Sequence, residues 1–192
     1  MNRLTQNLLL FMVGLALAVI AVRGSYTNYV TRSFTEKLGG INYTINVPAV
    51  VNSRVEKDVM ENVASTRQIM DLAKKAKLIL VGLSDASIGS SLGKSGNFRQ
   101  EEIDYLKGLG VIGNCNLVFM DGRGRHVDNR VEERIVRILE PSAMKKIPYR
   151  VGIAFGPSKV QVIAAALRGG WINQLVTDEE TATQILRKEK GA

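Results

Sequence analysis

The stretch "YRVGIAFGPSKVQVIAAALRGGWINQLV", Tyr149–Val176, decides the fold that the sequence predicts. It begins with an apolar segment of strand length over 149–155, and Gly156 with the proline after it favours a tight turn into a helix. An apolar stripe at helical spacing follows until a pair of glycines at Gly169 ends the helix. A second strand is predicted over 172–176. Strand, turn, helix and strand in this order are typical of a parallel sheet covered by helices.

A lysine stands at the start of this predicted helix. Lys159 falls at about the third helical position, where the helix dipole disfavours a cation by about 0.3–1 kcal/mol and attracts an anion. A phosphate or carboxylate bound at the turn would satisfy both the backbone amides and the ammonium group. The alternative is a solvated lysine whose small penalty is tolerated. Spacing alone leaves both interpretations open.

The rest of the chain continues the same alternation of elements. Hydroxyl residues followed three positions later by Glu or Gln predict helix starts at Ser53, Ser65 and Thr177. Short apolar segments predict further strands at Tyr43–Val47, Leu78–Leu83 and Leu117–Met120. We therefore expect an α/β domain with a mostly parallel, Rossmann-like sheet that helices cover on both faces. Ligands of such sheets bind at the carboxyl ends of the strands.

Composition limits the chemistry that this chain can perform. The chain has 192 residues, 45% hydrophobic and 23% charged, as in one globular domain. The only cysteine, Cys115, excludes an internal disulfide, and with the only histidine, His126, it leaves too few ligands for a Cys/His zinc site. The net charge of +8 favours anionic partners. We expect neither a metal nor another cofactor.

The amino terminus allows two interpretations. No charged residue lies between Arg3 and Arg23, and Leu8–Val22 is continuously apolar, a length between that of a buried core segment and a full membrane span. A signal sequence or membrane anchor is one interpretation, although the small residues lie inside the apolar run, where they make a poor cleavage signal. We expect instead that 1–22 forms a buried helix or strand of the domain that 23–192 completes, in a cytoplasmic protein without membrane contact.

Several ordered stretches of this chain resemble the SorC family of bacterial sugar-responsive transcriptional regulators. Arg150–Leu186 has the family's strand, Gly-x-x-Lys turn, helix, strand and Thr-Asp-Glu helix. The similarity extends upstream through "YTINVPAVVNSR", "LAKKAKLILVGLSD", "LKGLGVIGNCNLVFMDGRGR" and "RIVRILEPSAMKKIP". It also includes "VIAVRGSYTNYVTRSFTEKLGG", so that it covers roughly 19–186. The order of these pieces is the specific signal.

The resemblance implies an effector-binding domain with the fold shared by glucosamine-phosphate deaminase, ribose-phosphate isomerase and CoA transferases. Such a domain binds a phosphorylated sugar and relays its occupancy to a DNA-binding domain. The resemblance makes Lys159 the main anionic anchor, with Gly156 keeping the turn close to the ligand. Further ligand-site residues that it implies are Gly113, Asn114, Arg23, Gly24 and Ser84. Asn114 replaces an aspartate of the family, so an anionic acceptor becomes a neutral amide that both donates and accepts.

Two departures from the family pattern bear on function. Residues 1–22 resemble neither the family's helix-turn-helix nor its early Gly-Gly-Thr-Thr-like phosphate loop. The chain is therefore expected to bind its sugar without contacting DNA itself, as a homo-oligomer. Either it is a truncated or divergent copy whose front is replaced by an apolar segment, or that front supplies a substitute strand while the ligand site is weakened.

Other features keep alternative interpretations. Asp121 in "FMDGRGR" could orient a sugar hydroxyl or cap its Asp-Gly turn. The basic region over 123–150 is interleaved with acidic residues and lacks an aromatic ladder, so it does not indicate nucleic-acid binding. A sugar-phosphate isomerase or deaminase would need an acid or base near the ligand, for which Asp85 and Asp121 are the candidates. A membrane-tethered or oligomerising module is a third class. We expect no enzymatic activity.

Overall fold

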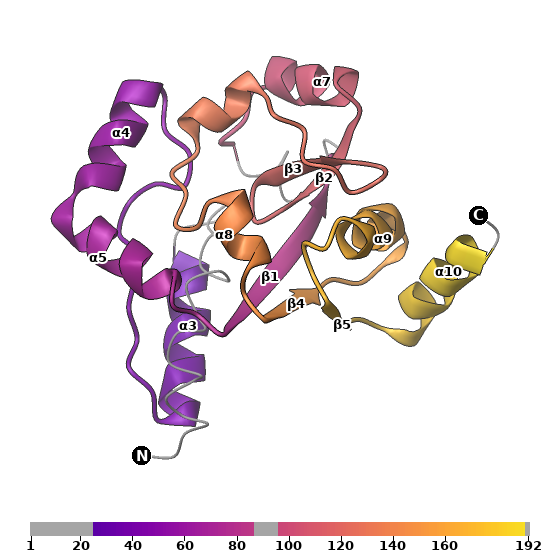
Figure 1. Cartoon of the computed structure of the whole chain (residues 1–192), viewed down its shortest axis with the longest axis horizontal. Helices are drawn as coiled ribbons and strands as arrows, with labels where there is room; N and C mark the ends of the chain where they lie inside the picture. The colour runs from indigo at the N-terminus through magenta and orange to yellow at the C-terminus, as the bar shows by residue number, and fades with distance from the viewer. Residues whose placement is uncertain (1–24, 87–95, 191–192) are drawn as a thin grey trace.

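The computed structural model describes residues 25–86 and 96–190 (Figure 1). The first helices are α3 (Ser25–Leu38), α4 (Arg54–Asn62) and α5 (Ala64–Ala73). The elements that follow are β1 (Leu78–Asp85), α7 (Gln100–Gly108), β2 (Val111–Cys115), β3 (Val118–Asp121), the 3₁₀ turn η1 (Arg130–Arg134), α8 (Pro141–Lys145), β4 (Tyr149–Ile153), the 3₁₀ turn η2 (Pro157–Lys159), α9 (Val160–Arg168), β5 (Gln174–Val176) and α10 (Glu179–Lys190). The predicted segment 1–22 and the predicted ligand residues Arg23 and Gly24 lie outside the described residues.

The five strands form one sheet in the order β3-β2-β1-β4-β5. Strands β1, β4 and β5 are parallel, whereas β2 is antiparallel to both β1 and β3. The predicted α/β class is confirmed, but the sheet is mixed, since two of its four strand pairings among the described residues are antiparallel. The reason is a tight hairpin: Asn116 and Leu117 both have positive φ and join β2 directly to β3. The parallel half contains the predicted strand, turn, helix and strand.

One predicted strand does not form. Residues 43–47 contain no strand, and residues 44–47 line a cavity of about 280 Å³ beside α4 and α5. The backbone hydrogen bonds of this region are made just after it, where Val136 N–H donates to Ala49 and Val51 N–H donates to Arg134. The apolar side chains in this segment therefore reflect packing against helices and do not indicate a strand.

A helix begins within two residues of each predicted start, but only one of the three predicted capping residues is correct. Ser53 precedes α4, and its Oγ accepts a hydrogen bond from the Glu56 N–H at 3.2 Å. Ser65 does not cap α5, because the helix begins one residue earlier, at Ala64, without a side-chain cap. Thr177 does not cap α10, because Asp178 Oδ1 accepts from the Thr181 N–H at 2.6 Å instead.

The main core lies between the sheet and α9. Val162, Ile163 and Ala165 of this helix are fully buried, and the helix packs against β1, β2 and β3. A Cβ added to Gly113 of β2 would stand only 2.6 Å from Val162 Cγ2. Cys115 lies in the same core, and burial raises the pKa of its thiol to about 12. Its predicted role as a small core residue is confirmed.

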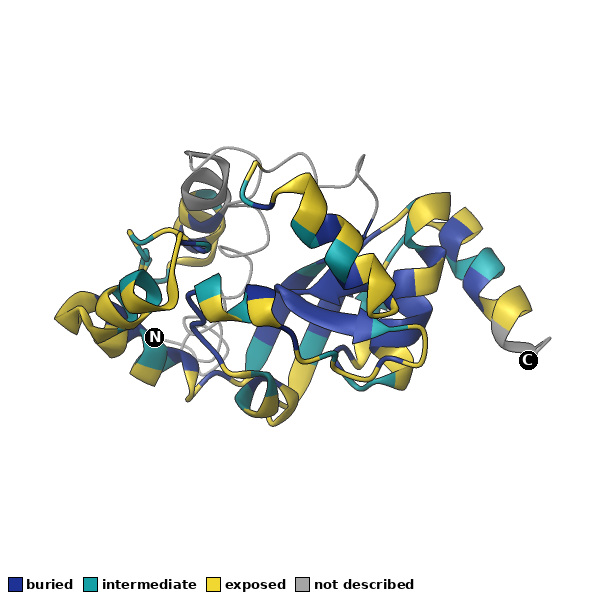
Figure 2. Cartoon of the chain, turned by 90° about the horizontal axis from the view of Figure 1, so that it is seen from above, coloured by how far each residue is buried: buried dark blue, intermediate teal, exposed yellow. Residues whose placement is uncertain are grey.

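The opposite face of the sheet is incompletely covered at β4 and β5. Gly152 faces the core, where its Cβ would meet Ile172, so Tyr149 and Ile153 point to the other face. These two side chains and Val176 of β5 are exposed. Figure 2 shows how buried and exposed residues are distributed over the whole ribbon. The prediction that helices cover both faces is therefore wrong for this half of the sheet, as far as the described residues extend. Among them, no helix is both long and apolar enough to cross a membrane.

Candidate functional site

The carboxyl ends of the three parallel strands meet at one edge of the sheet, which we call the carboxyl edge. It comprises 84–85 at the end of β1, 154–159 after β4 and 177–178 after β5. The antiparallel β2 contributes as well, because its register pairs Asn114 with Ser84 and Gly113 with Asp85. The structure thus brings five of the predicted ligand residues to this edge: Ser84, Gly113, Asn114, Gly156 and Lys159.

Lys159 is directed toward the end of β1. Its Nζ lies 3.4 Å from Asp85 Oδ2, and the two side chains are only 18% and 15% exposed. Lys159 closes the 3₁₀ turn η2, and α9 begins at Val160, so the lysine precedes the helix instead of occupying its third position. In this structure the lysine therefore meets a carboxylate of its own chain. The sequence predicted Asp85 only as a candidate acid for an enzyme.

The turn between β4 and α9 depends on Gly156. Its φ is +99°, a conformation that residues with a side chain rarely adopt. The Gly156 N–H donates to Thr181 Oγ1 at 2.8 Å, which ties the turn to α10. Hydrogen bonds from Thr181 hold the pKa of Asp178 below its usual value. The bond from the Thr181 backbone N–H has the larger effect, and the bond from its hydroxyl has the smaller one. Sequence reasoning missed Thr181, because the contact joins segments that are distant in sequence.

Two buried polar atoms near this edge have no hydrogen-bond partner among the described residues. They are Asn114 Nδ2 and Thr177 Oγ1. The other end of the Asn114 amide is fixed, because its Oδ1 accepts from the Leu117 N–H at 3.2 Å. An unsatisfied buried polar group costs about 1–3 kcal/mol. Such atoms occur where a ligand or an ordered water completes the hydrogen bonding.

The other predicted residues have different surroundings. Ser84 Oγ donates to the Asp85 carbonyl at 3.3 Å. Gly113 is explained by close packing, since a Cβ there would also stand 2.4 Å from the Ser84 carbonyl oxygen. Glycine at this position lets β1, β2 and α9 approach one another.

Asp121 is the predicted residue that the structure does not bring to Lys159. It ends β3, which is three strands from β4 in the sheet, or roughly 14 Å at the usual strand spacing. Its Oδ1 accepts from the Arg123 and Arg125 N–H groups at 2.9 Å each, and its Oδ2 pairs with the Arg125 guanidinium at 2.8 Å. Burial opposes ionisation, but these hydrogen bonds outweigh it and hold the pKa of Asp121 below its usual value. The Asp121 carboxylate thus stabilises the turn in which it lies.

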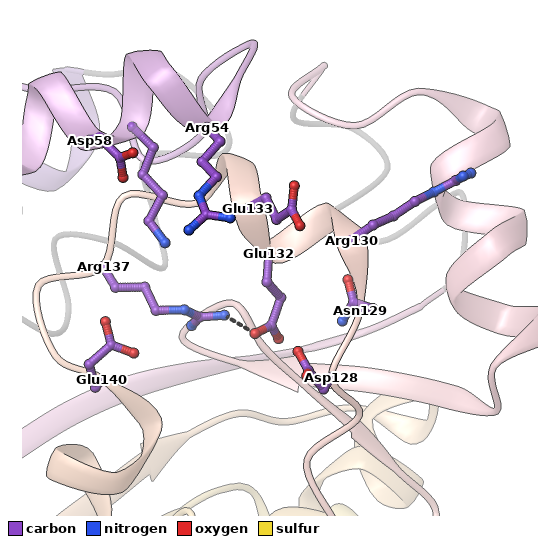
Figure 3. Close-up of a pocket in the computed structure, with 10 residues that line it drawn as sticks. Arg54, Asp58, Asp128, Asn129, Arg130, Glu132, Glu133, Arg137 and Glu140 are labelled. Carbon is purple, nitrogen blue, oxygen red and sulfur yellow. Dashed lines mark ion pairs between the residues drawn. The ribbon is translucent and has the colours of Figure 1, made fainter.

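A second cavity lies beside α4 and η1 and is named here the charged pocket (Figure 3). It encloses about 530 Å³ and is lined by Arg54, Lys57, Asp58, Asp128, Asn129, Arg130, Glu132, Glu133, Arg137 and Glu140. Figure 3 shows Arg137 reaching toward Glu132 across the pocket; the two groups are 2.7 Å apart. Glu132 also lies 2.9 Å from His126 Nε2. The described residues contain no group of three or more His, Cys, Asp or Glu placed to hold a metal.

Comparisons with known proteins extend over most of the chain. The family described as "Putative sugar-binding domain" matches residues 13–187. The transcriptional regulator LsrR of Escherichia coli is 46% identical over 79 residues, which are 41% of this chain and 25% of LsrR. The erythritol catabolism regulatory protein EryD of Brucella abortus is 28% identical over 163 residues, or 84% of this chain and 51% of EryD.

A solved structure shows the same fold. The full-length sorbitol operon regulator SorC from Klebsiella pneumoniae matches with a TM-score of 0.78 at 27% identity, over 83% of this chain and 52% of that one. The chain therefore spans from a quarter to about half of the length of these relatives.

Proposed function

Because the chain belongs to the sugar-binding domain family, whose model matches residues 13–187, we propose that it binds a phosphorylated sugar at the carboxyl edge. In this role it is the effector-binding part of a bacterial transcriptional regulator. The relatives LsrR, EryD and SorC are all named as regulators, and two of those names refer to the polyols erythritol and sorbitol. The observation that carries the proposal is the position of Lys159 between α9 and Asp85.

Lys159 is the anchor for the phosphate. It stands immediately before the nine-residue helix α9, whose first N–H groups and positive dipole end attract an anion. A charge-assisted hydrogen bond from the ammonium group to a phosphate oxygen contributes about 1.5–3 kcal/mol. Asn114 Nδ2 has no partner among the described residues, but its side chain lies on the sheet face opposite to Asp85 because neighbours along a strand alternate. It therefore meets only a part of the ligand that extends past the carboxyl edge.

Asp85 sets a condition on the charge of the ligand. Its carboxylate lies 3.4 Å from the Lys159 ammonium, so a phosphate that approaches the lysine also approaches a negative charge. Repulsion is avoided where the carboxylate accepts hydrogen bonds from sugar hydroxyls and the phosphate takes the far side of the ammonium group. A neutral sugar would use the same carboxylate without this constraint.

The proposal includes self-association and no direct contact with DNA. Three arginines of the basic region are held in ion pairs: Arg125 with Asp121, Arg134 with Glu102 and Arg137 with Glu132. Pairing with acids removes these side chains from a coherent basic surface, which nucleic-acid binding requires. This arrangement supports a domain that does not contact nucleic acid through these arginines.

Titration calorimetry with hexose and pentose phosphates, each beside its unphosphorylated sugar, tests the proposal. We expect Lys159→Met to weaken sugar-phosphate binding by about 10- to 150-fold, the range that a charge-assisted bond supplies. Lys75→Met, an exposed lysine that precedes the amino end of β1 and so lies toward the opposite edge of the sheet, is the matched control and should bind like the unchanged protein. Asp85→Asn should tighten the phosphorylated ligand and weaken the neutral one. Equal affinities for Lys159→Met and the unchanged protein would refute the anchor.

An isomerase or deaminase is the second candidate, because Asp85 lies beside the proposed anchor and could transfer a proton. Incubating the protein with each sugar phosphate that binds, and recording NMR spectra of the sugar, separates the two functions. An effector domain leaves the sugar unchanged over hours. Conversion that Asp85→Asn abolishes would establish the enzyme.

A further inference from the structure

Apolar side chains gather on the face of the parallel strands that lies opposite α9. We call Tyr149, Ile153, Phe155 and Val176 the open sheet face; they are 53%, 38%, 69% and 56% exposed. Ile153 and Val176 lie side by side, because the register of β4 and β5 pairs them. Ala154 is buried in the main core, so the next residue, Phe155, points to the open side as well.

The open sheet face continues into a small apolar cluster. Leu80 of β1 pairs in register with Val151 of β4, and both are buried together with Leu78 in a cluster separate from the main core. The apolar surface therefore extends across neighbouring strands and along about 20 Å of β4, from Tyr149 to Phe155. A contiguous exposed apolar patch of this kind marks an interaction surface.

The chain at the start of the parallel strands is positively charged. We call 74–77, 145–148 and 170–173, which precede β1, β4 and β5, the amino edge. These ranges contain no acidic residue and five lysines: Lys74, Lys75, Lys77, Lys145 and Lys146. Only Lys74 among them is in an ion pair with a described residue, Asp71. The amino edge therefore keeps most of its positive charge.

The carboxyl edge has the opposite charge. Lys159 and Asp85 pair with each other there. The exposed Asp178 is followed directly by the exposed Glu179 and Glu180 at the start of α10. The open sheet face itself is uncharged, so the strands run from a positive end to a negative end with an apolar surface between them.

We propose that the open sheet face binds the same face of a second copy of this chain, with the strands of the two copies antiparallel. A two-fold axis that runs across the strands places the amino edge of each copy over the carboxyl edge of its partner. Lysines then meet acidic side chains at both ends of the interface. A parallel arrangement would place lysines over lysines, and such like charges repel. The charge pattern therefore favours a second copy, in one orientation.

The arrangement has the anatomy of a protein–protein interface. Its centre is uncharged and contains two aromatic side chains, Tyr149 and Phe155, and its charged groups lie at the rim. Two sheets that pack face to face keep their strand directions within about 30° of each other. Four exposed apolar side chains are a small centre, since a standard interface takes about 20–30 residues from each partner. We therefore expect a dimer that dissociates on dilution.

Sedimentation equilibrium of the full chain, over a range of concentrations, tests the proposal. We expect a monomer–dimer equilibrium whose dissociation constant rises about tenfold in Phe155→Ala, because truncating an aromatic side chain at an interface weakens binding by this amount. Phe155 is exposed in the single chain, so its loss leaves the core intact. Leu186→Ala is the matched control. Leu186 is exposed on α10, which packs against α9, so the variant should dimerise like the unchanged protein.

Charge reversal tests the orientation. Lys77→Glu with Lys146→Glu reverses the amino edge, and Glu179→Lys with Glu180→Lys reverses the carboxyl edge. Each pair alone should weaken the dimer by about tenfold or more, because like charges then face each other. All four substitutions together should restore the dimer, because each edge again meets the opposite charge. Circular dichroism of each variant verifies its fold.

This proposal rests on the self-association proposed above, and the measurements separate the two. A dimer that Phe155→Ala leaves unchanged would overturn the open sheet face as the interface, while self-association would stand. A chain that stays monomeric at every concentration would overturn both. If the fourfold variant does not recover the dimer, the antiparallel arrangement is wrong.

Discussion

The carboxyl edge and the charged pocket each hold a basic side chain against a carboxylate, but the surroundings differ. Arg137 is 2.7 Å from Glu132, is 5% exposed and also donates to the Leu117 carbonyl. Lys159 lies 3.4 Å from Asp85 at the start of a helix, near buried polar atoms that have no partner among the described residues. In the charged pocket, Arg137 and Glu132 satisfy each other, whereas at the carboxyl edge a buried amide nitrogen and a buried hydroxyl have no partner among the described residues. This difference in hydrogen bonding, and not the density of charge, is the reason for placing the ligand at the carboxyl edge.

The largest effect is expected in the charged pocket. Arg137→Met leaves Glu132 buried without its main partner, and removing one member of a buried ion pair costs about 3–5 kcal/mol of unfolding free energy. Urea denaturation measures this loss. Arg130→Met is the control: its guanidinium lies 4.3 Å from the Tyr105 ring at an exposed position, where the contact contributes about 0.5–1 kcal/mol. If both variants lose the same unfolding free energy, the Arg137–Glu132 pair does not have the structural role that distinguishes this pocket from the carboxyl edge.

A smaller effect is expected from the packing that positions the carboxyl edge. Gly113→Ala places a Cβ 2.4 Å from the Ser84 carbonyl oxygen and 2.6 Å from Val162 Cγ2, so β1, β2 or α9 must move. Overpacking of this kind costs about 1–3 kcal/mol, and the shift of α9 should also weaken sugar binding. Gly122→Ala, where a Cβ would meet nothing within 4 Å, should change neither the unfolding free energy nor the affinity.

Local sequence signals predicted the elements that position the site, whereas contacts between distant segments could not be predicted. The turn from β4 into α9 was predictable because Gly156, the following proline and the apolar stripe are neighbours in sequence. The hairpin of β2 and β3 was missed because a leucine, Leu117, adopts positive φ in a turn that glycine usually marks. The contact of Lys159 with Asp85 was missed because it depends on the order of β1 and β4 in the sheet.

The smallest expected effect concerns Asp178, whose hydrogen bond with Thr181 supports the turn at Gly156. Hydrogen bonds from Thr181 lower the pKa of Asp178 in the folded protein below the ordinary aspartate value of about 4. Its contribution to stability is therefore complete above about pH 4 and is lost as the pH falls through the lower folded value. Asp178→Ala should therefore lower the melting temperature slightly at pH 7, and the difference should shrink toward pH 3. Asp178→Asn keeps an acceptor that does not titrate, so it should melt near the unchanged protein at pH 7. If the melting temperature of Asp178→Ala stays below that of the unchanged protein by the same amount at every pH, hydrogen bonding to the ionised carboxylate does not stabilise this edge. The carboxyl edge would then no longer differ from the ion-paired pocket in the way described above.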